Sequence, residues 1–188
     1  MIRRLLSKPL TWALIAVLGA GAAFGLYWFQ PWRLVTDTTV SDDLAPVAAP
    51  SPMLSSPSSS APSPTASPTS PTAPVVVRQG TFISHEHETK GAARLVRKGD
   101  GTHQLELVGL DTSDGPDLRV WLTDQEVTTG PAAWKVFDDG THIELGRLKG
   151  NRGNQVYPVP SDAELRTYRS ISIWCKRFSV SFGAALLQ

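Results

Sequence analysis

The chain has 188 residues, a formal net charge of +1, 15 prolines and a single cysteine. From Val75 onward, Lys and Arg are balanced by Asp and Glu, so there is no net basic face of the kind that contacts phosphates, and nucleic acid is excluded as a partner. A single cysteine also excludes an internal disulfide.

The first part of the chain contains an apolar stretch long enough to cross a bilayer. Residues 10–29 carry no charged side chain, and a helix of this length spans a hydrocarbon core of about 30 Å. Arg3, Arg4 and Lys8 precede the stretch, which predicts a cytoplasmic N-terminus at residues 1–9 and an exported remainder. We therefore expect a single-pass protein of the cell membrane, attached through residues 10–29, with its N-terminus inside and its C-terminal domain outside.

A cleaved signal peptide is the alternative to this retained anchor. It requires a shorter apolar region and a small-x-small cleavage site directly after it. Residues 27–32 read Tyr-Trp-Phe-Gln-Pro-Trp, which is a poor cleavage site, so we favour a retained anchor. Both alternatives place the C-terminal domain outside the cytoplasm.

Residues 30–78 are predicted to form an extracytoplasmic linker. The stretch from Leu44 to Val77 has no charged residue and is dominated by Pro, Ser, Thr and Ala, a composition too poor in large apolar side chains to fold. Its repeated Pro-Ser and Pro-Thr steps favour extended conformations that rise about 3.1 Å per residue. We expect a semi-rigid spacer that holds the next domain away from the membrane.

Residues 79–188 are long enough for one independent core, and their pattern is that of an all-β domain. Short runs in which every second residue is apolar alternate with Gly, Asp, Asn and Pro, and a helical turn is expected at 132–137 or 162–166. We predict a β-sandwich or a closed barrel of seven or eight short strands. The expected strands cover residues 80–85, 92–97, 103–108, 117–123, 141–148, 155–159, 168–174 and 178–186.

Several motifs follow one another in this domain. They are GTF at 80–82, GPDL at 115–118, LGRLKGNRGNQVY at 145–157 and WC at 174–175. In this order and spacing they resemble the DM13 domain over nearly all of residues 79–187. The resemblance implies an extracytoplasmic module that transfers electrons, in which a near-invariant cysteine serves as a bare thiol or as the attachment point of a prosthetic group such as haem. Cys175 is the matching position, and His87 also fits the family pattern, as a ligand of haem or copper.

The residues around Cys175 leave three roles open, which are a buried inert thiol, a reactive or intermolecular thiol, and a ligand of iron or copper. The apolar alternation changes register between Trp174 and Arg177, which predicts a bulge or a tight bend. Such a bend would bring the sulfur to the domain edge, where Lys176 and Arg177 favour the thiolate. Cys175 is therefore the candidate catalytic and cofactor-binding residue.

His85 and His87 are the candidate metal ligands. They lie two residues apart, which places both imidazoles on one face if the strand continues through them. A third ligand has to come from elsewhere, with His103, His142 and Cys175 as the candidates. A solvent-exposed strand end explains the same pair without a metal.

These patterns favour an electron-transfer or thiol-redox module that acts through Cys175. Its cofactor is haem, copper or none, and its partner is a redox partner or a component of the cell envelope. The alternative is a non-catalytic domain that binds a protein or a glycan of the cell envelope. The sequence contains neither the GxSxG elbow nor a phosphate-binding glycine loop, so it indicates no hydrolase or transferase.

Overall fold

A computed structural model describes residues 9–46 and 73–188 of the chain. The expected cytoplasmic end, up to residue 8, and the central part of the expected linker, residues 47–72, lie outside the described residues. Helix α2 covers Pro9–Phe29, and the 3-10 helix η1 covers Pro31–Val35. The region Pro9–Arg33 is long and apolar enough to cross a membrane, although a signal sequence has the same properties.

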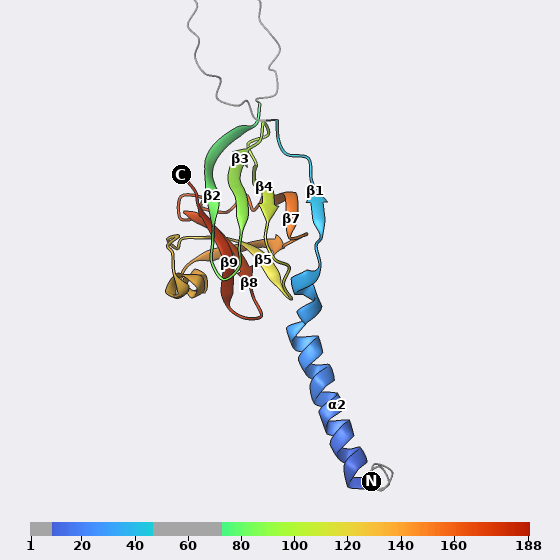
Figure 1. The fold of residues 1–188 in the computed structure, drawn as a ribbon. Helices are drawn as coiled ribbons and strands as arrows, with labels where there is room; N and C mark the ends of the chain where they lie inside the picture. The colour runs from blue at the N-terminus through green and yellow to red at the C-terminus, as the bar shows by residue number, and fades with distance from the viewer. Residues whose placement is uncertain (1–8, 47–72) are drawn as a thin grey trace, which may run out of the picture.

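The rest of the described chain is mostly β structure, with nine strands in one sheet that curves into a half-barrel (Figure 1). The all-β class is confirmed, whereas the strand count is nine and not the seven or eight that we predicted. The 3-10 helix η2, Pro131–Asp138, confirms the helical turn expected at 132–137. The strands are β1 (Thr39–Ser41), β2 (Val75–Ser84), β3 (Lys90–Arg97), β4 (His103–Asp111), β5 (Leu118–Thr123), β6 (His142–Arg147), β7 (Arg152–Val159), β8 (Ser170–Cys175) and β9 (Val180–Leu186).

The strand order across the sheet is β1-β7-β4-β3-β2-β9-β8-β5-β6. Strand β2 belongs to both halves of this sheet. It pairs with β3 as far as Thr81 and with β9 over its last residues. Gly80 lies just before this change of partner, and a Cβ there would overlap the carbonyl oxygen of Leu186. Glycine allows the two backbones to approach this closely.

The sheet buries apolar side chains on both faces of β8. Ile173 and Cys175 belong to the large cluster inside the half-barrel, whereas Trp174 belongs to a smaller cluster that η2 covers from outside. This division follows from the pleat, which turns successive side chains of a strand to opposite faces. Burial of each large apolar side chain contributes about 1.5–3 kcal/mol to stability.

Residues 37–45, which lie within the expected linker, pack along the domain, and we call them the strap. Strand β1 of the strap pairs in parallel with β7. Gly150 and Gly153 make room for it, because a Cβ at either position would overlap a carbonyl oxygen of the strap. Gly150 and Gly153 therefore form part of the surface on which the strap lies.

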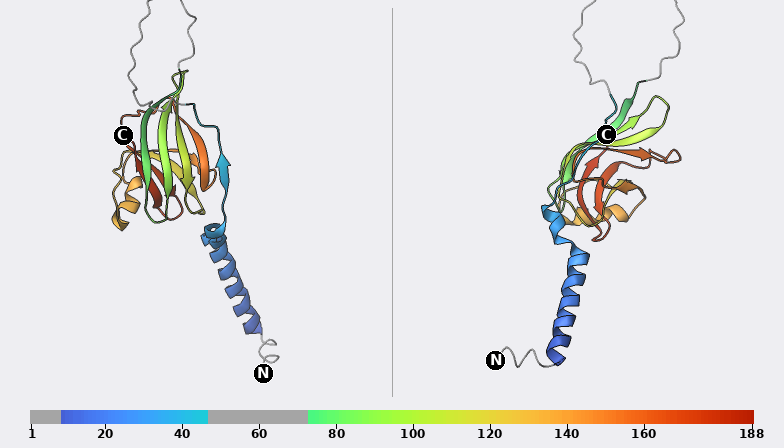
Figure 2. Two further views of the ribbon diagram at one scale, coloured as in Figure 1. Left: turned by 45° about the horizontal axis from the view of Figure 1, so that its top comes forward. Right: turned by 90° about the vertical axis from the view of Figure 1, so that its right-hand side faces the viewer.

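The strap changes the place of the proline-rich segment in the protein. The backbone N–H of Ala45 donates to Glu106 at 2.7 Å, and the chain returns to the sheet at Val75, which pairs with Arg97. Both contacts lie at the end of the domain opposite to α2 (Figure 2). We expected a spacer between the helix and the domain. Residues 47–72 instead connect two points at the far end of the domain, so they do not separate the helix from the domain.

Candidate functional site

Residues singled out in the sequence gather at the end of the domain next to α2. Cys175 is the last residue of β8, and Phe178 lies in the turn of the β8–β9 hairpin. Phe178, His87 from the loop after β2, and residues 115–116 from the loop before β5 line one pocket of about 250 Å³. Phe29 at the end of α2 also lines this pocket, so the helix and the domain form it together.

Cys175 is completely buried, with an exposed fraction of 0%. Burial raises the pKa of its thiol, and this effect outweighs the hydrogen bonds from the backbone N–H groups of Phe178, Arg177 and Asp117, which lower it. The thiol is therefore protonated at neutral pH.

The structure contradicts our expectation that the sulfur reaches the domain edge. The alternation of β8 continues through Cys175, which pairs with Val180 across the hairpin and faces the inside of the half-barrel. The irregular pairing expected after Trp174 lies before it, between Ile173 and Trp174. Burial by the hairpin, and not the nearby basic side chains, decides the state of the thiol.

His85 and His87 have different surroundings. His85 is 6% exposed, packs against Phe137 and has its Nε2 at 3.2 Å from the carbonyl oxygen of Thr128. The ring of His87 lies 4.0 Å from that of Phe182, between centroids. Burial lowers the pKa of both imidazoles, which favours their neutral forms. Within residues 9–46 and 73–188, no group of three or more His, Cys, Asp or Glu side chains could hold a metal, so the predicted pair finds no third ligand there.

The donor residues do not fit a haem or a copper ion bound through Cys175. Such sites need a sulfur that reaches the metal together with further ligands. The sulfur of Cys175 is enclosed in the core, and the pocket lined by His87 does not include Cys175.

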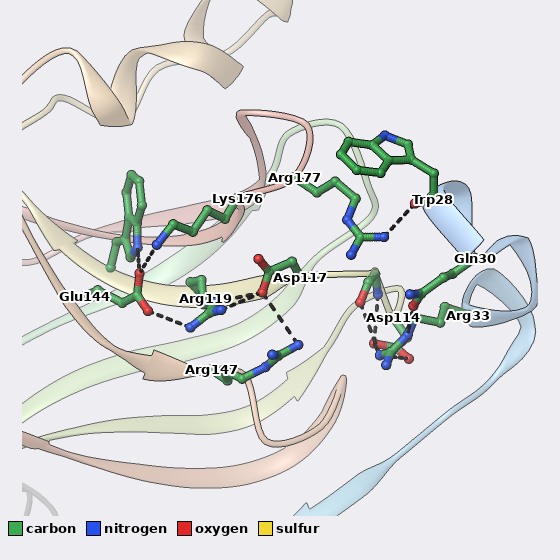
Figure 3. Close-up of polar contacts among 12 residues, drawn as sticks. Trp28, Gln30, Arg33, Asp114, Asp117, Arg119, Glu144, Arg147, Lys176 and Arg177 are labelled. Carbon is green, nitrogen blue, oxygen red and sulfur yellow. Dashed lines mark hydrogen bonds and ion pairs between the residues drawn. The ribbon is translucent and has the colours of Figure 1, made fainter. Parts of the chain in front are cut away.

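An ion-pair network supports the loop that precedes β5 (Figure 3). Asp117 of the GPDL motif pairs with Arg119 at 2.8 Å, and Arg119 also pairs with Glu144 at 2.7 Å. Lys176 of the hairpin turn approaches Glu144 at 3.4 Å, and its backbone N–H donates to the carbonyl oxygen of Asp117 at 2.9 Å. The network thus holds the backbone of Asp117 against the hairpin that carries Cys175.

A stacked pair of tryptophans lies next to Cys175, and the sequence analysis did not predict it. The ring centroids of Trp174 and Trp121 are 5.0 Å apart, and Trp121 stacks in turn on the exposed ring of His142 at 4.0 Å. The indole N–H of Trp121 donates to Glu144 at 3.4 Å. Only the pairing of β5 with β8 brings these rings together, so no local sequence signal could have revealed the pair.

Comparison with known protein families identifies the domain. Residues 81–187 match the family model described as electron transfer DM13. The chain belongs to the DM13 family. The match confirms the resemblance that the motifs indicated, and it covers Cys175 and the loops around it, whereas α2 and the strap precede the matched DM13 region. Neither a search of curated proteins nor a search of solved structures found a match.

Proposed function

We propose that this protein is a membrane-anchored electron-transfer module whose DM13 domain lies outside the cytoplasm and whose redox group is Cys175. Family membership supports electron transfer, and the basic residues before α2 support the outward placement of the domain. The environment of the sulfur carries the proposed role of Cys175. The single thiol is shielded from water in the core, and the backbone N–H groups of Phe178, Arg177 and Asp117 act on its pKa against the effect of burial.

The burial of Cys175 favours one-electron chemistry over disulfide exchange. An exchange reaction requires contact between sulfur atoms, so the hairpin would have to open first. Loss of one electron and one proton from the thiol leaves a sulfur radical, and the electron passes to a one-electron acceptor such as a metalloprotein. Asp117, which precedes the β5 residue that pairs with Cys175, is the candidate acceptor of the proton.

The tryptophan pair gives the electron a direction. Trp174 is the sequence neighbour of Cys175, and its stacking on Trp121 leads to His142 at the surface. An indole ring that carries a hole is stabilised by a hydrogen bond from its N–H to an acceptor, and Glu144 is the acceptor for Trp121. An electron acceptor would therefore dock near His142.

The test measures how many electrons the full-length chain gives up per molecule. The reduced protein in detergent is mixed with hexacyanoferrate(III), a small one-electron oxidant, and the loss of its absorbance is followed. Because Cys175 is the only cysteine, we expect the wild type to reduce hexacyanoferrate(III) and Cys175→Ser to reduce none, while Trp174→Phe slows the reaction and leaves its extent unchanged. Equal reduction by wild type and Cys175→Ser, with both proteins folded, would overturn the proposal.

The interaction-domain alternative also has an observation in its favour. A fully buried cysteine with a raised pKa behaves as a small apolar core residue. In that case Cys175 resists alkylation until the protein is unfolded, and the wild type reduces no hexacyanoferrate(III). The same measurement thus separates the two functions.

A further inference from the structure

Large apolar side chains are exposed where α2 meets the domain. Phe178, in the turn of the β8–β9 hairpin, keeps 39% of its surface exposed and stacks on Phe29, the last residue of α2, at 5.9 Å between centroids. Trp28 and Trp32 are 44% and 49% exposed beside it. Tryptophans at the end of an apolar helix are typical of a membrane interface.

Arg177 connects the β8–β9 hairpin to the last turn of α2. Its guanidinium donates to the carbonyl oxygens of Trp28 at 2.6 Å and Tyr27 at 3.4 Å, and it lies 5.3 Å from the ring centroid of Trp28. The last carbonyl groups of a helix lack partners within the helix, so an arginine that binds them is a firm connection. The depth of α2 in a bilayer therefore sets the depth of the hairpin.

A second connection lies on the other side of the pocket. Arg33 of η1 pairs with Asp114 in the loop before β5 at 3.2 Å and donates to the carbonyl oxygen of Gly115 at 3.3 Å. Between the two connections lies the pocket of about 250 Å³, whose apolar lining comes from Phe29, Pro31, Pro116, Phe178 and Phe182. The pocket thus lies beside the last turn of α2.

We propose that the tip of the β8–β9 hairpin lies in the outer interface of the membrane that α2 crosses, and that bilayer lipid covers Phe178 and fills this pocket. The continuity of Phe178 and Phe29 with the apolar surface of α2 identifies lipid as the occupant. The inference rests on the proposed membrane anchoring, and it does not depend on the redox role of Cys175.

The position of Cys175 gives this contact a consequence for the proposed function. The residue lies three positions before Phe178 on the same hairpin. In the proposed arrangement, a redox group at this position therefore lies near the bilayer surface.

The test places an environment-sensitive probe at the hairpin tip of the full-length chain in nanodiscs of phosphatidylcholine and phosphatidylglycerol. Phe178→Cys is labelled with the fluorophore NBD in a Cys175→Ser background. The matched control is Asp100→Cys, in the exposed β3–β4 turn, whose residues 98–102 carry no large apolar side chain. We expect emission at position 178 to shift to the blue and to be lost when brominated lipid replaces the ordinary lipid, with neither change at position 100.

A second measurement keeps Cys175 in place. With p-benzoyl-phenylalanine in place of Phe178, illumination should produce a lipid adduct in the intact mass spectrum, and the same group in place of Asp100 should not. Equal behaviour at the two positions in both measurements, or a mature chain whose mass lacks α2, would overturn the inference. Both measurements report only where the hairpin lies relative to lipid. Their failure is therefore distinguishable from a failure of Cys175→Ser to change the reduction of hexacyanoferrate(III).

Discussion

Substitution of the glycines that contact the strap, Gly150 and Gly153, tests whether the strap is part of the folded domain, with Gly101 as the control. Gly153 has a φ of +95°, and a Cβ there would overlap the carbonyl oxygen of Val40. Gly101 has a similar φ of +84° but no atom within 4 Å of such a Cβ. Gly153→Ala therefore adds a clash to the backbone strain, whereas Gly101→Ala adds the strain alone.

The expected costs follow from these differences. An L-residue in the left-handed region costs about 1–2 kcal/mol, which is the whole effect expected for Gly101→Ala. Gly153→Ala also forces β1 away from β7 and breaks the hydrogen bonds that hold the strap to residues 151–154, each of which contributes about 1 kcal/mol. Three of these bonds join Thr38 N–H to Asn151, Asp42 N–H to Asn154 and Arg152 N–H to Thr38. We expect a total of about 4–5 kcal/mol for Gly153→Ala, as the sum of strain and lost bonds.

The assay is denaturant unfolding of the full-length chain in detergent, followed by tryptophan fluorescence and combined with hydrogen exchange of the strap. Gly150→Ala separates the two contributions, because Gly150 has no positive φ but its Cβ would overlap the carbonyl oxygen of Thr38. We expect faster exchange of the strap amides in Gly150→Ala and Gly153→Ala, and wild-type exchange in Gly101→Ala. If Gly153→Ala costs no more than Gly101→Ala, or leaves the strap amides protected, the role assigned to the strap is wrong.

Three further predictions concern pH and one buried amide. Burial raises the pKa of Cys175, and it raises the pKa of Tyr157 from 10.0 to about 12. The unfolded chain therefore loses these protons first, and stability falls as pH rises above about 9. Tyr157 alone accounts for about 3 kcal/mol of this loss, so Tyr157→Phe should flatten the pH dependence of the unfolding free energy above pH 10. Burial lowers the pKa of His85 and His87, so the unfolded chain binds protons first and stability falls as pH drops below 6.5. His85→Leu should reduce the dependence of the unfolding free energy on pH in the same titration. Asn151→Ala should cost about 3 kcal/mol in denaturant unfolding, because it leaves the buried carbonyl oxygen of Thr112 without its donor and removes the hydrogen bond from the Thr38 N–H, whereas an unchanged midpoint would contradict this.

Local apolar patterning was sufficient to predict strands β2 to β9, although β8 and nearly all of β9 are buried on both faces, which alternation does not reveal. Strand β1 was missed for a physical reason. Its three residues, Thr39–Ser41, form a strand only because β7 offers a free edge, and no pattern within the strap records that pairing. The available signal was in the partner, since Gly150 and Gly153 beside a strand indicate a close approach of another backbone.

The candidate site was predictable in its members but not in its arrangement. The motifs identified Cys175, His87 and the GPDL loop, and the structure brings the loops that carry them to one end of the domain. The state of the sulfur was not predictable, since it depends on which face of β8 lies inside the half-barrel. The contact of Arg177 with α2 was equally hidden, because it joins residues that are far apart in the sequence.

The return of the chain to the far end of the domain has a consequence for how the protein can vary. Ala45 and Val75 are both held to the sheet, so residues 47–72 close a loop whose length does not alter the height of the domain. Doubling the length of a flexible loop costs only about 0.6 kcal/mol in closure entropy. Insertions, deletions or an entire additional folded module can therefore enter this stretch while the strap keeps Cys175 at a constant distance from the helix.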